Sequence, residues 1–311
     1  MAGLHRIDVH HHVTPPSLVG EKMRAGAGGG PTYAWTINKT LDDMEKGDVR
    51  AAMISLPHPI EVWPNPNDTR GLTREWNDYV AKLVTDYPGK FGQFAMLPIL
   101  DIEGSLREIE YAYDVLKADG INLMTSIGDK WLGDPHYDPI FAELNRRKAV
   151  VYTHPATPHC CVGMVPEIRD SVIEFGTDTT RAITRLLFSG AAAKYPDIKW
   201  IFSHAGGTAP FLTERLIRFS QTEKGMAARV PEGVLAYLKR FHYDTAQAAH
   251  PWALASLMRL VEVSQVLFGT DFPWRTAVET AKGVRDFGFS ESDILAIDSG
   301  NAEKLLTKWA R

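Results

Sequence analysis

Near its start the chain contains the stretch Arg6-Ile7-Asp8-Val9-His10-His11-His12, a short apolar run that ends in three consecutive histidines. Successive side chains of a β-strand point to opposite faces, so His10 and His12 share one face and His11 takes the other. Two imidazoles placed in this way can bind one metal ion. The alternative is a tag or solvated tail, but a tag is a longer polar run without a strand-like lead-in. We therefore expect a metal site that starts here and is completed from distant parts of the sequence.

The composition is that of an ordinary globular protein, with 44% hydrophobic and 23% charged residues among 311. The net charge is −4 and no basic run exceeds Arg146-Arg147-Lys148, so no nucleic-acid partner is expected. No apolar run reaches the roughly 18 residues that span a bilayer, and no secretory signal pattern is present, so no membrane partner is expected. The only cysteines, Cys160 and Cys161, are adjacent. They predict no disulfide, two buried small side chains and a reducing, cytoplasmic location.

Short apolar or β-branched runs alternate with segments of helical periodicity. The predicted strands are 7–9, 51–56, 91–97, 121–125, 150–154, 200–204, 241–245 and 266–270. The predicted helices include 40–46, 74–86, 102–118, 139–147, 178–193 with Asp178 as its N-cap, 251–260, 276–287 and 291–310. Eight alternations predict one domain over residues 1–311, a (β/α)₈ TIM barrel with a small insertion after the first strand. An open doubly wound sheet is the alternative, but no glycine-rich phosphate loop follows an early strand.

Four of these strands end in residues that can bind metal. They are His10 and His12, His154, His204 and Asp271. The carboxyl ends of the strands of such a barrel meet on one face, so these side chains should lie close together. A single histidine at a strand end is more often a core or turn residue, and Asp271 alone could cap a turn. The joint pattern instead predicts one divalent metal ion with nitrogen and oxygen ligands and an open coordination position.

Other residues after the strands are candidates for the pocket wall. His58 follows the second strand, although a surface loop histidine is an equal alternative. Trp63, Phe272 and Trp274 could pack against a planar ring, or simply plug the mouth of the barrel. The pair Gly206-Gly207 after His204 predicts a tight turn with close backbone approach.

The motifs at these strand ends resemble those of the amidohydrolase superfamily. The similarity is to the branch of aminocarboxymuconate semialdehyde decarboxylase and its relatives, which includes the γ-resorcylate decarboxylases. The opening stretch looks most like the 6-methylsalicylate decarboxylases. It runs over nearly the whole chain. The motifs are Ile7-Asp8-Val9-His10-His11-His12, Thr153-His154-Pro155, Ser203-His204-Ala205-Gly206-Gly207, Gly269-Thr270-Asp271-Phe272-Pro273-Trp274, Asp134-Pro135-His136-Tyr137-Asp138-Pro139, Asp178-Thr179-Thr180-Arg181-Ala182 and Gly300-Asn301-Ala302.

The resemblance implies roles for the residues of the predicted site. His10, His12, His154 and Asp271 would be the ligands of one divalent ion, for which we expect Zn²⁺, with Mn²⁺ as the alternative. His204 would be the catalytic base beside the metal or a further ligand, and Asp271 would share in catalysis.

The resemblance also implies a homodimer. Arg215, eleven residues past His204, matches an arginine that reaches a substrate carboxylate, in some relatives in the neighbouring subunit's pocket. From the residues alone, an ion pair on the surface of its helix is a strong alternative.

Two departures from the family's pattern narrow the expected substrate and the expected number of metal ions. Asp42 stands where aminocarboxymuconate semialdehyde decarboxylase has a substrate arginine, so that substrate is not expected. The fourth strand, 120–126, lacks the lysine that bridges two metals, so one ion is expected.

The leading hypothesis is non-oxidative decarboxylation of an aromatic or unsaturated (hydroxy)carboxylic acid, with release of CO₂. Asp271 or His204 would deliver a proton to the carbon that carries the carboxylate. Metal-dependent hydrolysis of a lactone or amide at the same site is the alternative, because both reactions use the same ligand set. A third reading, a non-catalytic metal-binding barrel, requires a site with no open position.

Overall fold

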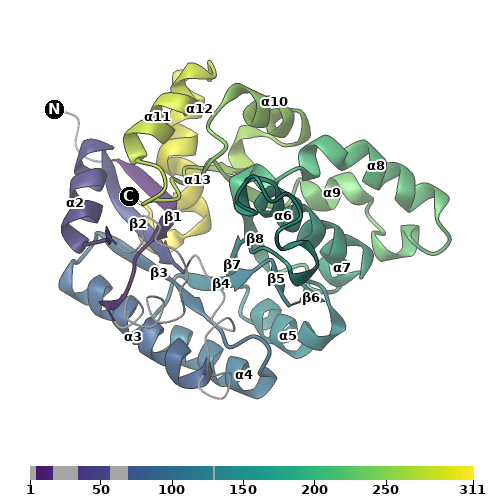
Figure 1. Ribbon diagram of the computed structural model, residues 1–311, viewed down its shortest axis with the longest axis horizontal. Helices are drawn as coiled ribbons and strands as arrows, with labels where there is room; N and C mark the ends of the chain where they lie inside the picture. The colour runs from purple at the N-terminus through teal and green to yellow at the C-terminus, as the bar shows by residue number, and fades with distance from the viewer. Residues whose placement is uncertain (1–4, 17–33, 57–68, 129) are drawn as a thin grey trace.

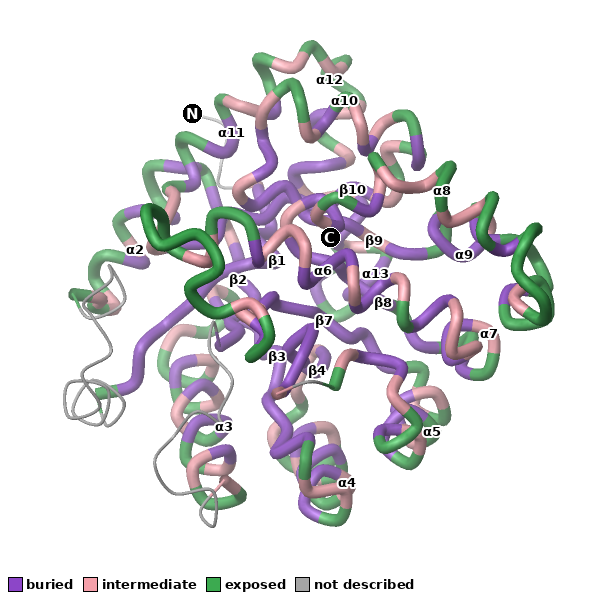
Figure 2. Tube along the Cα trace, turned by 45° about the vertical axis from the view of Figure 1, so that its right-hand side comes forward, coloured by how far each residue is buried: buried purple, intermediate pink, exposed green. Residues whose placement is uncertain are grey.

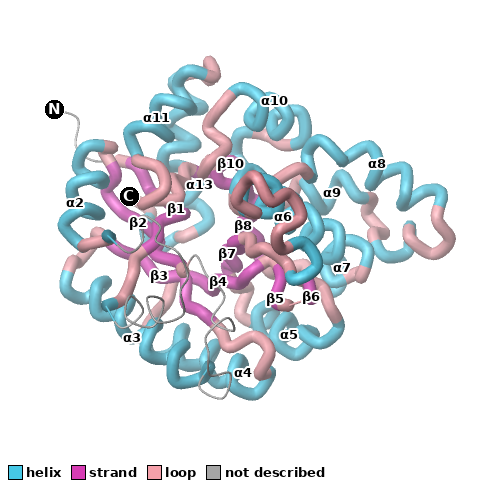
Figure 3. Tube along the Cα trace, in the orientation of Figure 1, coloured by secondary structure: helices cyan, strands magenta, loops and turns pink. Residues whose placement is uncertain are grey.

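Eight parallel strands follow one another around a barrel, and helices surround them (Figures 1 and 3). This computed structural model describes residues 5–16, 34–56, 69–128 and 130–311. The strand order is β1-β2-β3-β4-β7-β8-β9-β10. Backbone hydrogen bonds from Val9 N to Phe268 O and from Asp271 N to His10 O connect the two ends of the sheet. The predicted (β/α)₈ barrel is confirmed, whereas most of the predicted insertion after β1 lies outside the described residues.

The strands of the barrel are short and almost wholly buried. Their bounds are β1 Arg6–His12, β2 Val49–Ser55, β3 Phe91–Met96, β4 Gly120–Met124, β7 Val150–His154, β8 Lys199–Phe202, β9 His242–Asp244 and β10 Val266–Leu267. A two-stranded antiparallel hairpin, β5 Ser126–Ile127 with β6 Lys130–Trp131, follows β4.

The helices form the outer layer, with exposed outer faces and buried inner faces (Figure 2). They are α2 Ile37–Lys46, α3 Thr69–Asp86, α4 Ile102–Glu110, α5 Asp138–Arg146, α6 Ser171–Phe188, α7 Ala191–Lys194, α8 Ala209–Thr222, α9 Val234–Leu238, α10 Pro251–Leu260, α11 Ala277–Asp286, α12 Glu291–Leu295 and α13 Asn301–Leu305. Side-chain caps mark several starts, such as Thr36 before α2 and Thr276, in a capping box with Glu279, before α11. Within the described ranges, no helix has the length and apolar character needed to cross a bilayer.

Two expectations about individual residues are wrong. Asp178 is not an N-cap, because α6 begins at Ser171 and Asp178 lies on its buried inner face. There its carboxylate accepts hydrogen bonds from Thr125, Ser126 and Trp131, which ties α6 to the end of β4 and to the hairpin. The cysteines are not buried either. Cys160 is exposed and Cys161 half-buried, both as free thiols, because they lie in a short turn after β7 and not on a core-facing element.

The core has two layers. One face of the strands fills the barrel interior with residues such as Ile7, Val9, Met53 and Tyr152, and the other packs against the helices. The C-terminal segment closes the amino-terminal end of the barrel: Trp309 donates to Asp119, just before β4, and its carbonyl accepts from Arg50. The opposite end, where the strands terminate, is the end that carries the predicted site.

A half-buried histidine, His242, makes the stability of the fold depend on pH. Burial lowers the pKa of His242, at the start of β9, to about 4, whereas an unfolded chain binds this proton near 6.5. The contribution of neutral His242 to the free energy of unfolding is therefore complete above about pH 6.5 and is lost as the pH falls toward 4. Between pH 7.5 and pH 5 the free energy of unfolding should fall by about 2 kcal/mol less in His242→Gln than in the wild type. Urea unfolding of both proteins at the two pH values measures this, and equal losses would contradict it.

Candidate metal centre

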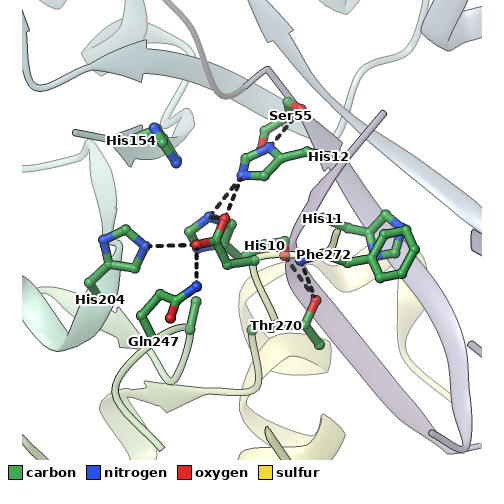
Figure 4. A network of polar contacts seen from close by, with 12 residues as sticks. His10, His11, His12, Ser55, His154, His204, Gln247, Thr270 and Phe272 are labelled. Carbon is green, nitrogen blue, oxygen red and sulfur yellow. Dashed lines mark hydrogen bonds and ion pairs between the residues drawn. The ribbon is translucent and has the colours of Figure 1, made fainter. Parts of the chain in front are cut away.

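Five side chains converge at the carboxyl-terminal end of the barrel, and the four histidines among them are labelled in Figure 4. His10 and His12 lie on β1, His154 ends β7, and His204 and Asp271 follow β8 and β10. Ligand atoms of His10, His154, His204 and Asp271 all lie within 4.8 Å of one another. Nε2 of His12 lies 3.0 Å from Nε2 of His10. The structure thus brings together all five residues that the strand ends predicted.

A β-bulge in β1 turns His10 and His12 toward this site. Between Asp8 and His11, β1 has one more residue than the paired stretch of β2. Ile7 and Val9 face the barrel interior, so strict alternation would send His10 outward; the extra residue brings His10 and His12 inward. All seven residues of β1 are buried, which excludes a tag or solvated tail.

His11 faces away from the site, as predicted. Its Nδ1 lies 3.0 Å from Asp8 Oδ2, and its ring stacks on Phe272 with centroids 4.7 Å apart. Phe272 is therefore buried against His11 and does not line the pocket, contrary to one suggested role. The other side chain from that loop, Trp274, does reach the site, with its ring edge-on to His12 at 5.6 Å.

Hydrogen bonds fix the orientation of three imidazoles. Nδ1 of His10 lies 2.8 Å from Asp244 Oδ2, Nδ1 of His12 lies 3.0 Å from the Ser55 carbonyl, and Nδ1 of His154 lies 2.9 Å from the Pro155 carbonyl. Carboxylate and carbonyl oxygens can only accept, so each Nδ1–H must donate. When the rings are neutral, their Nε2 lone pairs then face the site, which is the arrangement that metal-binding histidines require.

The spacing of the inward-facing atoms fits a single metal ion. Nε2 of His10, Nε2 of His12 and Oδ1 of Asp271 form a triangle with sides of 3.0, 3.2 and 3.3 Å. Ligands bound at about 2.1 Å stand about 3.0 Å apart at right angles and about 3.4 Å apart in a tetrahedron. Asp271 Oδ1 and His204 Nε2 are buried, and no described residue forms a hydrogen bond to either. A cation would satisfy these atoms.

The charges of the site are strongly coupled. Burial alone would lower the pKa of His10, but the carboxylates of Asp244 and Asp271 outweigh it and raise that pKa to about 10. Burial lowers the pKa of His12 and, further, that of His154. Burial alone would raise the pKa of Asp271, yet His10 and the contacts with the neighbouring histidines hold it well below its ordinary value. The site therefore holds buried negative charge that needs a positive partner.

Strained backbone is concentrated here. His204, Ala205, Gln247 and Asp271 have φ between 53° and 67°, in the left-handed region. They are four of the seven non-glycine residues with positive φ in the described chain. Such conformations are held by their surroundings and gather at functional sites. The predicted close approach at Gly206-Gly207 is confirmed, because a Cβ on Gly207 would lie 2.0 Å from the Gly176 carbonyl oxygen.

The sequence interpretation missed Asp244, which the same rule would have found at the end of the predicted strand 241–245. Asp244 Oδ2 binds His10, while its Oδ1 accepts the backbone N–H groups of His204 and Ala246. This carboxylate thus orients one predicted ligand and positions another site residue. Phe175, on α6, was also missed; it lies parallel to the His204 ring at 6.4 Å and had no signal in the sequence.

Two further candidates lie outside this cluster. Arg215 is exposed on α8 and forms no hydrogen bond or ion pair with any residue that the structure describes, so the alternative of a surface ion pair is not realised. His58, like Trp63, falls outside the described residues.

Replacing Asp244 should disrupt the site without removing any ligand. An amide has one acceptor oxygen, so Asp244→Asn cannot serve both His10 Nδ1–H and the two backbone N–H groups. We expect divalent-metal affinity to fall about 10- to 100-fold, as measured by competition with a chromophoric chelator. Asp298→Asn is the matched control: it is a buried carboxylate bound to Arg6 at the start of β1 and should leave metal affinity unchanged. Equal affinities of Asp244→Asn and the wild type would contradict the orienting role.

The chain resembles known proteins over nearly its whole length. The sequence profile of the amidohydrolase family matches residues 7–308. A 6-methylsalicylic acid decarboxylase of Penicillium expansum is 34% identical over 274 residues, covering 86% of this chain and 85% of its own length. A crystal structure described as an amidohydrolase II superposes with a TM-score of 0.90 at 27% identity and covers 97% of this chain and 99% of its own.

A second solved structure adds a bound metal. The dihydroxybenzoic acid decarboxylase of Polaromonas sp. JS666, with bound manganese and the inhibitor 2-nitroresorcinol, superposes with a TM-score of 0.84 at 21% identity. It covers 97% of this chain and 97% of its own length. The profile match and the fungal relative together show that this chain belongs to the amidohydrolase family.

Proposed function

We propose that this protein is a metal-dependent, non-oxidative decarboxylase that releases CO₂ from an aromatic hydroxy acid of the salicylate type. The observation that carries the proposal is the buried set of inward-facing imidazole nitrogens and the Asp271 oxygen. Beside it lies His204 Nε2, to which no described residue forms a hydrogen bond. The reaction of the relative from Penicillium expansum supports the choice of decarboxylation over lactone or amide hydrolysis.

In this proposal His10, His12, His154 and Asp271 hold one divalent ion. When bound, the ion would supply a Lewis acid that binds the substrate's carboxylate and an adjacent oxygen. The strand β4, Gly120–Met124, has no lysine to support a second ion. Imidazole-rich sites suit zinc, which we propose, with manganese as the alternative because the Polaromonas enzyme contains it. Elemental analysis of the purified protein distinguishes the two.

The chain's own residues would manage the proton. His204 Nε2 and Asp271 Oδ2 are 3.5 Å apart, so the two groups lie side by side at the site. This pair would deliver the proton to the ring carbon that carries the carboxylate. The electrons of the broken C–C bond return to the ring as CO₂ leaves, and no oxidant or reductant is consumed. Phe175 and Trp274 flank the site and would contact a planar substrate ring.

The roles of the outlying residues stay predictions. We propose that Arg215, which is exposed on α8, binds the substrate carboxylate in the pocket of a neighbouring subunit, in a homodimer. The substrate-binding role of His58 and the cytoplasmic location likewise stay predictions.

Loss of either member of the proton-handling pair, His204 or Asp271, should slow turnover strongly. We expect Asp271→Asn and His204→Asn to lower the rate of CO₂ release from hydroxybenzoates by about 10²- to 10⁴-fold, the usual contribution of a general acid. His242→Gln removes a half-buried histidine from the opposite end of β9 and should keep full activity. If Asp271→Asn retained full turnover with bound metal, its proposed role would be wrong.

Metal removal tests the reaction itself. Dialysis against a chelator should eliminate CO₂ release, and one equivalent of Zn²⁺ or Mn²⁺ should restore it. A parallel panel of lactones, followed by a pH indicator, separates the alternative reaction. Lactone opening without CO₂ release would replace decarboxylation by hydrolysis. Bound metal with no turnover on either panel would indicate a non-catalytic barrel.

A further inference from the structure

A hydrogen-bonded chain leads from the rim of the barrel to Asp271. Nε of Arg275 donates to Oε1 of Gln247 at 2.9 Å, and Nε2 of Gln247 donates to Oδ2 of Asp271 at 2.9 Å. Gln247 follows β9, and Arg275 precedes α11; both are half-buried. In Figure 4 a dashed line marks the hydrogen bond that the Gln247 amide donates.

The two neighbours leave the amide of Gln247 only one orientation. A guanidinium can only donate hydrogen bonds, and an ionised carboxylate can only accept them. Gln247 must therefore present its oxygen to Arg275 and its NH₂ to Asp271. A flipped amide would place two donors face to face at Arg275 and two acceptors face to face at Asp271.

This orientation makes the two oxygens of Asp271 different. Oδ2 receives the Gln247 hydrogen bond and the contact with His204, whereas Oδ1 faces His10 and His12. No described residue forms a hydrogen bond to Oδ1. Without Gln247 the carboxylate could rotate and present either oxygen to the histidines.

We propose that Gln247 is a positioning residue that selects Oδ1 of Asp271 as the metal-binding oxygen, and that Arg275 acts through Gln247 by fixing its amide. The inference rests on the proposed function only in that Asp271 binds the metal. A purely structural role, in which Gln247 merely joins two loops, is the competing explanation.

The backbone of Gln247 supports a role beyond loop packing. Its φ of 53° lies in the left-handed region, which glycine occupies freely and glutamine rarely. A position that needed only this backbone conformation would be better served by glycine. Glutamine occupies the position despite this strain, and its two polar ends make the contacts with Arg275 and Asp271 described above.

The conformation also provides a clean test. Gln247→Gly removes the side chain and relieves the backbone, which offsets the lost hydrogen bonds, so the unfolding midpoint of the metal-free protein should stay close to that of the wild type. Zn²⁺ affinity, measured by chelator competition, should nevertheless fall at least 10-fold. The visible spectrum of the Co²⁺-loaded protein should also change, because it reports the geometry of the ligands. Gln265→Ala, a half-buried glutamine just before β10, is the matched control and should alter neither quantity.

Arg275→Ala should give a smaller fall in Zn²⁺ affinity, because the amide becomes free to flip. In the Gln247→Gly background the same change should have no further effect, since the proposed influence of Arg275 passes through Gln247. A Gln247→Gly protein with wild-type Zn²⁺ affinity and an unchanged Co²⁺ spectrum would overturn the inference. Additive losses from the two substitutions would overturn the part assigned to Arg275. None of these readouts involves a substrate, so a wild-type protein that binds metal but releases no CO₂ would refute the proposed function alone.

Discussion

Two buried carboxylates, Asp244 and Asp271, lie on opposite sides of one imidazole, His10. Negative charge in a protein interior is tolerated only beside a compensating positive charge or a bound cation. In the metal-free chain the proton on His10 meets this demand, which explains why its pKa rises to about 10 despite complete burial. A divalent cation would meet the same demand and displace that proton. The remaining features of the site follow from holding these groups in place.

The closure of the barrel holds these charged groups in place. Asp8 accepts hydrogen bonds from the backbone and hydroxyl of Thr270, and His12 N donates to the Phe272 carbonyl. These contacts join the first strand to the segment after the last strand, 262 positions away in sequence. The seam between the first and the last strand of the barrel therefore runs directly beneath the site. The left-handed backbone at His204, Gln247 and Asp271 shows that the surrounding packing, and not local preference, determines these positions.

Much of this arrangement could be predicted from strand ends alone. Parallel strands in a barrel bring their carboxyl ends together, so His10, His12, His154, His204 and Asp271 were predictable as one cluster without any distance information. Asp244 obeys the same rule and was overlooked. The roles of Gln247 and Arg275 could not be predicted from the sequence. Neither residue ends a strand, and each acts through a contact with a residue far along the chain. Asp178 was misassigned for a related reason: its position among helix-forming residues suggested a cap, while its actual partners belong to β4 and the hairpin.

The sequence by itself determined the fold class and which residue types stand at the strand ends, since hydrophobic periodicity and strand–helix alternation are local properties. It also placed His10 and His12 on one face. The tertiary structure decided that this face is the inner one, because a bulge against β2 shifts the alternation that Ile7 and Val9 begin. It also decided which nitrogen of each imidazole faces inward, since those orientations depend on acceptors from Ser55, Pro155 and Asp244. With the exception of Pro155, these partners meet the histidines only when strands distant in sequence pair. Hydrogen-bond chemistry at a site of this kind is therefore set by folding and not by the motif.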